Sequence, residues 1–102
     1  MEISRNEKDL IFDLTVKHFL RKEFSEAHEL AKELVRYKYP NEKKSIRMAI
    51  HIALEAENYE AAGQYCIQLL KVNPEDAFTR KILYLLENSE DKSTIKMNFR
   101  SS

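Results

Sequence analysis

The chain is poor in the residues that interrupt helices, with one glycine and two prolines among 102 residues. Such a composition favours helix along nearly the whole length, and the length fits one domain. A single cysteine, Cys66, excludes an internal disulfide bond, which is typical of proteins from reducing compartments. The scarcity of these three residue types therefore predicts one all-α domain without covalent cross-links.

No charge of one sign dominates, because 17 basic and 17 acidic side chains cancel. No net field therefore attracts nucleic acid or anionic lipid. The sequence also lacks any apolar run near the roughly 20 residues that span a bilayer. Residues 1–5 do not form the apolar stretch of a secretory signal. We therefore expect a cytoplasmic protein without a membrane span, for which nucleic acid is an unlikely partner.

An internal repeat at a spacing of 35 residues (24 to 59) is the main positive signal. The recurring pairs are Ile11 and Ile46, Phe24 and Tyr59, Ala27 and Ala62, and Leu34-Val35 and Leu69-Leu70. Pro40 recurs as Pro74, one residue short of this spacing, so the first unit carries one extra residue before its proline. A repeat of this length is typical of stacked helical hairpins that share a core.

Helical periodicity, capping residues and prolines predict five helices. They cover about residues 4–21, 24–37, 41–56, 59–72 and 75–87. The first helix is expected to start near Ser4 or Asn6, and Asn41 and Asn58 are expected to open the third and fourth helices. Glu75 and Asp76 are expected in the first turn of the fifth, where carboxylates complement the helix dipole. Connections of two to five residues require successive helices to pack antiparallel.

The helical pattern stops at Asn88, so we divide the chain into a helical domain (1–88) and a polar linker with a tail (89–102). Within the tail Ile95, Met97 and Phe99 alternate with polar residues, as in an extended segment. A loose terminus is the preferred interpretation of so short a pattern. The alternative is that these three side chains cover an apolar surface of the domain.

Residues 58–76 resemble the second helix of a tetratricopeptide repeat, which opens with an aromatic residue, has a small residue three positions later and closes with Asn-Pro. Tyr59, Ala62 and Asn73-Pro74 match that pattern, and Phe24 with Ala27 matches the opening in the preceding unit. The resemblance implies a right-handed superhelix of antiparallel helical hairpins, with repeat one at about 9–40, repeat two at 43–76 and a cap helix at 75–87.

The first helix of each unit departs from the family pattern. The aromatic and Leu-Gly positions hold Ile11, Leu14 and Thr15 in unit one, and Ile46, Ala49 and Ile50 in unit two. Two units are also fewer than the roughly three that usually bury a continuous core. We therefore expect either the fifth helix or another chain to complete the core.

In this family the first helix of each hairpin lines a concave groove. Here one apolar stripe of the first helix, Ile11, Leu14 and His18, matches the face within the hairpin. A surplus stripe contains Phe12, Val16, Phe19 and Leu20. The surplus predicts a surface for a peptide or amphipathic helix of another protein, unless the tail or a second copy covers it. The predicted partner-binding residues are Phe12, Val16, Phe19, Arg47, Met48, His51, Leu54 and Lys81.

The predicted function is therefore a non-enzymatic adaptor, co-chaperone or assembly factor. Some family members bind a C-terminal carboxylate through Lys, Asn and Arg, and Arg47 and Lys81 supply two such cations. Phe12, Asp13 and Val16, however, stand where that clamp requires Lys and Asn. The alternative is a structural module that associates with itself or belongs to a longer array.

Catalytic, metal and cofactor sites are not predicted. His18, His28 and His51 lie on three different helices without metal-ligand spacing, and no phosphate loop or nucleophile elbow occurs. We expect His18 at the edge of the core, His28 exposed to solvent and Cys66 buried and inert. A basic, tyrosine-containing region surrounds the turn at residues 37–40, and a solvated loop is favoured there over a nucleic-acid site.

Overall fold

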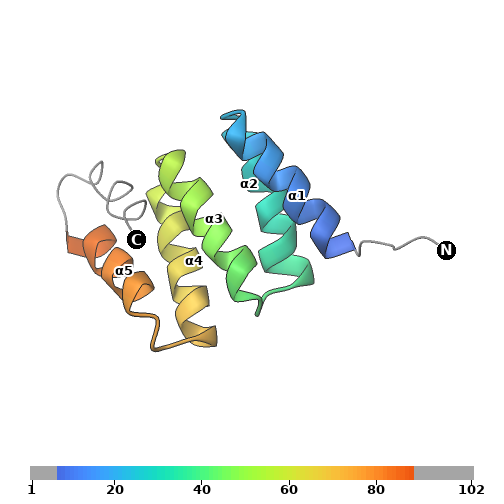
Figure 1. Ribbon diagram of the computed structural model, residues 1–102. Coiled ribbons are helices and arrows are strands. Elements are labelled where there is room, and N and C mark those ends of the chain that lie inside the picture. Colours follow the sequence, from blue (N-terminus) through green and yellow to red (C-terminus); the bar gives the residue numbers. More distant parts are fainter. Residues whose placement is uncertain (1–6, 89–102) are drawn as a thin grey trace.

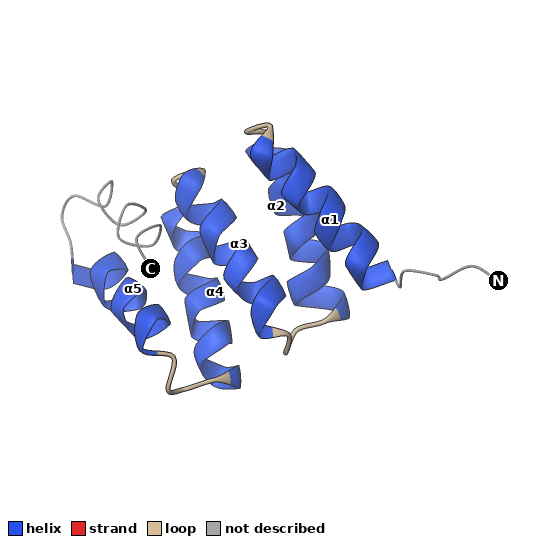
Figure 2. Cartoon of the chain, in the orientation of Figure 1, coloured by secondary structure: helices blue, strands red, loops and turns tan. Residues whose placement is uncertain are grey.

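The computed structural model describes residues 7–88 of the chain. These residues form five α-helices and one π-helical segment, without strands, which confirms the all-α class (Figures 1 and 2). The elements are α1 (Glu7–Leu20), α2 (Phe24–Lys32), η1 (Glu33–Lys38), α3 (Lys43–Glu55), α4 (Tyr59–Val72) and α5 (Ala77–Asn88). The predicted cap Ser4 and the predicted tail lie outside the described residues.

The helices pack as two hairpins and a final helix. In the first hairpin α1 packs on α2, and in the second α3 packs on α4. Helix α3 also contacts α2, which joins the hairpins, while α5 packs on α4 at the end of the row (Figure 1). The short connections thus give antiparallel neighbours, as expected.

The core is one cluster of buried side chains that runs from the first hairpin through the second to α5. Its largest fully buried side chains include Leu34, Ile50, Tyr65, Leu69 and Ile82. Small residues such as Ala27 and Ala62 are also fully buried and let the helices approach closely. Cys66 is buried as predicted, and burial raises the pKa of its thiol to about 12. That thiol stays protonated at neutral pH and is a poor nucleophile.

The π-helical segment η1 takes up the extra residue of the first unit. The Tyr39 N–H donates to the Leu34 carbonyl oxygen at 2.6 Å, across five residues instead of four. The predicted helix over 24–37 therefore changes to the wider π form after Lys32. Gln68 of α4 donates to the carbonyl oxygens of Val35 (2.6 Å) and Pro40 (3.0 Å), so the second hairpin satisfies acceptors at the end of the first.

One of the predicted capping residues is confirmed and one is wrong. The Asn58 side chain accepts a hydrogen bond of 3.2 Å from the Ala61 N–H and caps α4 as expected. Asn41 does not cap the third helix, because α3 begins only at Lys43 and Glu42 occupies the N-cap position. The Glu42 carboxylate instead accepts a hydrogen bond from the Ser45 hydroxyl within the first turn of α3.

The fifth helix begins later than predicted. Its first residue is Ala77, so Glu75 and Asp76 precede the helix and do not belong to its first turn. Asp76 Oδ1 accepts a hydrogen bond of 3.1 Å from the Thr79 N–H. A carboxylate at the N-cap satisfies a free backbone N–H, which explains why the helix starts after this residue.

Both hairpin turns have a residue in the left-handed conformation at the same position, and in neither turn is that residue a glycine. Lys22 (φ 63°) follows α1 and Glu57 (φ 59°) follows α3, at the repeat spacing. After α1 the Glu23 N–H donates to the His18 carbonyl oxygen at 2.9 Å. After α3 the Asn58 N–H donates to the Ala53 carbonyl oxygen at 2.8 Å. These bonds define a Schellman motif at each turn, and the repeat therefore extends to the backbone.

Polar contacts also join the two hairpins. His28 Nε2 lies 2.8 Å from the Tyr65 hydroxyl, and Arg36 donates to Gln64 at 2.9 Å. The prediction that His28 is exposed is wrong, because Tyr65 and the neighbouring helix leave it half-buried. Burial, followed by the nearby Lys32 charge, lowers the pKa of His28. The imidazole is therefore neutral at pH 7, and its unprotonated nitrogen can accept a hydrogen bond from the Tyr65 hydroxyl.

Candidate protein-binding face

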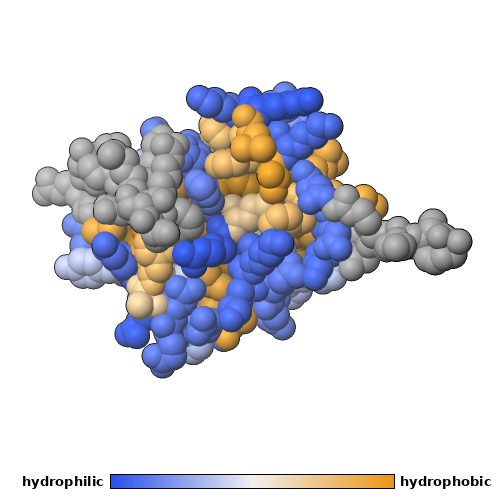
Figure 3. All heavy atoms as spheres, viewed as in Figure 1, coloured by the Kyte–Doolittle hydropathy of each residue, from blue (hydrophilic) through white to orange (hydrophobic). Residues whose placement is uncertain are grey.

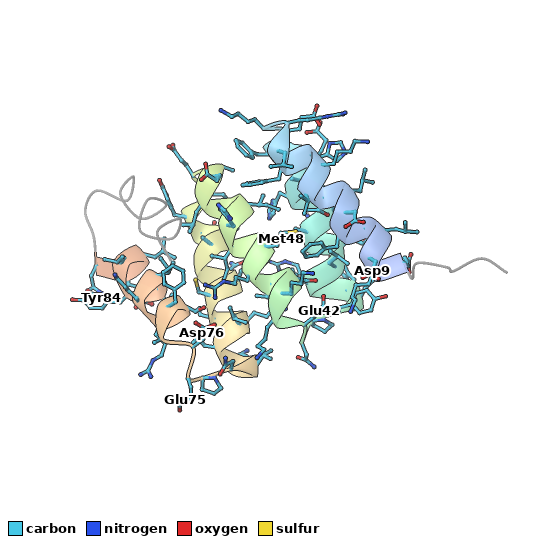
Figure 4. All side chains as sticks on the ribbon, in the orientation of Figure 1. Asp9, Glu42, Met48, Glu75, Asp76 and Tyr84 are labelled. Atoms are coloured by element: carbon cyan, nitrogen blue, oxygen red, sulfur yellow. The ribbon has the colours of Figure 1, made fainter. Side chains whose placement is uncertain are left out.

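The surplus apolar stripe of α1 faces α3. Phe12, Val16 and Phe19 occur at positions i, i+4 and i+7, so they lie along one side of α1. Met48 and His51 provide the matching side of α3, and Figure 4 places Met48 between the two helices. We call these five residues the α1–α3 face. All five are half-buried, and Figure 3 shows apolar surface gathered over the junction of α1 and α3.

Aromatic rings close one end of the α1–α3 face. The Phe19 ring centroid lies 5.0 Å from that of His51 and 5.8 Å from that of Phe24. Beside these rings is an open hollow of about 340 Å³, which Leu20 and Lys22 also line. An apolar side chain of a partner could enter this hollow and contact the aromatic rings.

The other end of the face is polar. The Lys44 ammonium lies 4.7 Å from the Phe12 ring centroid, a cation–π arrangement. Glu42 forms an ion pair of 2.5 Å with Lys8. Burial raises the pKa of Glu42, but hydrogen bonds from Lys8 and Ser45 outweigh this effect and leave the pKa lowered. A second hollow of about 280 Å³ lies at this end, and its lining carries charges of both signs: Lys8, Asp9, Phe12, Asp13, Glu42 and Lys44.

The predicted cations Arg47 and Lys81 have different environments. The Arg47 guanidinium lies 5.0 Å from the Phe78 ring centroid, and its Nη1 is 3.5 Å from Asp76 Oδ2. Asp76 therefore already compensates part of the charge of Arg47. Lys81 is exposed and lies one turn beyond Phe78 on α5. These contacts weigh against a carboxylate clamp, because Asp76 and Phe78 already engage the Arg47 guanidinium.

Leu54 is wrongly predicted as a partner-binding residue. Helix α3 packs against α2, α4 and η1, and this environment leaves Leu54 fully buried in the core. Lys44 and Phe24, which belong to the same surface, were missed. Lys44 could have been found from its position one helical turn before Met48.

Leu14 does not lie within the first hairpin as predicted. Its side chain is 44% exposed, while its neighbour Thr15 is fully buried. The Thr15 hydroxyl donates to the Ile11 carbonyl oxygen at 2.7 Å, so a polar residue fits there without an unsatisfied group. The hairpin interior is thus formed around Ile11 and Thr15, and Leu14 is displaced to the outer edge of α1.

Two of the three histidines pair with carboxylates close by in the sequence. His18 Nδ1 lies 2.6 Å from Glu23, and His51 Nε2 lies 3.8 Å from Glu55. Among residues 7–88, no group of three or more His, Cys, Asp or Glu side chains is placed to hold a metal ion. None of the described helices is both long and apolar enough to cross a lipid bilayer.

Comparisons of the chain with models of protein families, with curated proteins and with solved structures found no match. The resemblance of the sequence to tetratricopeptide repeats therefore rests on its own residues. The α1–α3 face is the surface that combines apolar side chains from two helices with a hollow at each end.

Proposed function

We propose that the chain is a non-enzymatic protein-interaction module of the tetratricopeptide type. Its α1–α3 face holds a peptide or amphipathic helix of another protein, as an adaptor or assembly factor does. The observation that supports this function best is the row Phe12, Val16, Phe19, Met48 and His51, half-buried at the surface and contributed by two helices. Contiguous apolar surface of this kind is typical of interaction sites.

The dimensions of the row suit a short helix. Phe12 and Phe19 are two helical turns apart, about 10 Å along the axis of α1. An amphipathic helix presents apolar side chains at i, i+3, i+4 and i+7 over the same length. The hollow beside Phe19 and His51 accepts one large apolar anchor, and the opposite end of the face, with Lys44 beside Phe12, offers polar contacts of both signs.

A co-chaperone function that captures a C-terminal carboxylate is less favoured. It requires several unengaged cations, whereas Arg47 already interacts with Asp76 and Phe78. Lys81 alone provides a point charge without the bidentate geometry that selects a carboxylate. Apolar contacts therefore make the main contribution to affinity in our proposal, and Lys44 and Lys81 add orientation.

The test is affinity capture with the full chain, followed by mass spectrometry of the proteins that bind. Phe12→Glu with Phe19→Glu should abolish capture of proteins that bind the α1–α3 face. Because both rings also contact the core, the milder Val16→Glu provides a second variant, and circular dichroism verifies folding. Ile67→Glu is the matched control, since Ile67 is 47% exposed on α4. Equal capture by all folded variants would contradict the proposal.

A further inference from the structure

The outer edge of the first hairpin exposes apolar side chains. Leu10 is 53% and Leu14 44% exposed, although both lie on a packed helix. Leu14 and Leu30 line an open hollow of about 410 Å³ between α1 and α2. We call this surface the end face. Its residues are Leu10, Leu14, Lys17 and Arg21 from the first helix and its turn, and Glu26, Glu29 and Leu30 from α2.

The end face is distinct from the α1–α3 face. Helical geometry places Leu10, Leu14, Lys17 and Arg21 on one stripe, because they are three or four residues apart. Phe12, which interacts with Lys44 of α3, is two residues from Leu14 and therefore about 200° away around the helix. The end face is consequently turned away from the second hairpin.

The internal repeat indicates what normally covers such a stripe. At the repeat spacing, Leu10, Leu14 and Lys17 correspond to three residues of α3 that are all buried: Ser45, Ala49 and Ile52. Helix α3 has α2 of the first hairpin packed against it, whereas α1 has no preceding hairpin within residues 7–88. In this architecture the stripe is therefore a packing surface, and among residues 7–88 no helix occupies the corresponding position beside α1.

The side chains at these positions do not suit another repeat of the same kind. Ser45 and Ala49 are small and allow close approach of α2, whereas Leu10 and Leu14 keep a neighbouring helix further away. Packed helix axes lie about 8–10 Å apart, and the distance depends on the side chains at the contact, so two leucines require a larger separation than a serine and an alanine. The end face therefore differs in shape from the surface that α3 offers to α2.

The charges of the end face indicate which helical hairpin could pack against it. Lys17 and Arg21 follow Leu14 toward the turn, and Glu29 and Glu26 precede Leu30 toward the same turn. Within the described region Lys17, Arg21 and Glu26 form no ion pair. Glu29 pairs with Lys32 of its own helix at 3.4 Å. The face therefore has cations along one helix and carboxylates at the same height along the other.

We propose that the end face binds a second copy of this chain in a two-fold symmetric dimer. A two-fold axis in the plane of the contact and parallel to the helices places α1 opposite the partner's α2 and keeps every residue at its own height. Leu14 then meets the partner's Leu30. Lys17 and Arg21 meet the partner's Glu26 and Glu29, and the same contacts form twice.

The test begins with the mass of the full chain in solution. Light scattering after size exclusion, over about a hundredfold range of concentration, should show a dimer that dissociates on dilution and more readily at high salt. A wild-type chain that stays monomeric throughout overturns the proposal and means that another protein or the chain's own termini cover the end face.

Charge reversal tests the pairing itself. K17E/R21E and E26K/E29K should each be monomeric at a concentration where the wild type is dimeric, because like charges then face each other. An equimolar mixture of the two variants should dimerise again, since both contacts of the mixed dimer are complementary. A mixture that stays monomeric, with both variants folded by circular dichroism, overturns the proposed arrangement of α1 against the partner's α2.

Two further variants locate the contact. Leu14→Glu should abolish dimerisation, whereas Ile67→Glu, a residue of similar exposure on α4, should leave it intact. A dimer that survives Leu14→Glu uses another surface and contradicts the proposal. Val16→Glu should still dimerise, so failure of the α1–α3 face as a ligand site and failure of the end face as a dimer contact are distinguishable.

Discussion

The contact between His28 and Tyr65 predicts a pH dependence of stability that one substitution should reduce. His28 is half-buried on α2, and its Nε2 lies 2.8 Å from the hydroxyl of the fully buried Tyr65 on α4. Burial lowers the pKa of His28, and the Lys32 charge lowers it further. Protonation therefore opposes the folded state and leaves His28 without a nitrogen that can accept a hydrogen bond from the Tyr65 hydroxyl.

The sign follows from linkage. The unfolded chain has the ordinary histidine pKa of about 6.5, while the folded value is lower. Below about pH 6.5 the unfolded state thus binds more protons, so the free energy of unfolding falls as the pH falls through the lowered folded pKa. Above about pH 6.5 the stabilising contribution is fully present. Carboxylates that are ion-paired in the folded chain, such as Glu42, add their own dependence at lower pH.

The perturbation is His28→Gln, compared with Tyr65→Phe. Loss of one such hydrogen bond costs about 1 kcal/mol, which corresponds to roughly 4–8 °C in Tm for a domain of this size. Urea unfolding at about pH 7.5 and pH 5.5 should show a smaller loss of stability on acidification in His28→Gln than in the wild type. An equal loss of stability on acidification in the wild type and in His28→Gln would refute the conclusion that His28 is neutral in the folded chain.

Three other predictions concern stability and reactivity. Lys22→Gly or Glu57→Gly should each raise the free energy of unfolding by about 0.5–1 kcal/mol, because glycine adopts positive φ without strain; a lowered urea midpoint would contradict this. Gln68→Ala should destabilise by about 1–2 kcal/mol, since two carbonyl oxygens lose their donor, whereas Gln64→Ala, at an exposed contact, should cost less. A thiol reagent should modify Cys66 only as fast as the protein unfolds, and rapid modification in native buffer would show that the thiol is accessible.

Local chemistry explains what could be predicted of the fold. The five helices follow from periodicity over long segments, and Asn58 is predictable as a cap because asparagine before a helix can accept from a free backbone N–H, as it does from Ala61. Asn41 failed on the same reasoning, since Glu42 competes for the N-cap position. The π-helical segment had one sequence signal, the extra residue before Pro40, but that signal does not say whether a loop or a helix takes it up.

The candidate site was less predictable because it depends on which sides of a helix its neighbours cover. The surplus stripe with Phe12, Val16 and Phe19 was found from spacing alone. Leu54 and Leu14 were misassigned, since the burial of one and the exposure of the other depend on packing between helices. His28 was misassigned for a related reason, as its partner Tyr65 is 37 residues away.

The π-helical segment η1 (Glu33–Lys38) affects how the sequences of related chains would align with this one. A length change of one residue is absorbed inside the helix, so the connection to the next hairpin stays short. Homologues without the insertion would be aligned out of phase by any method that assumes a constant repeat period. A profile that permits one gap per unit at this turn would keep both hairpins in register and increase sensitivity to distant members.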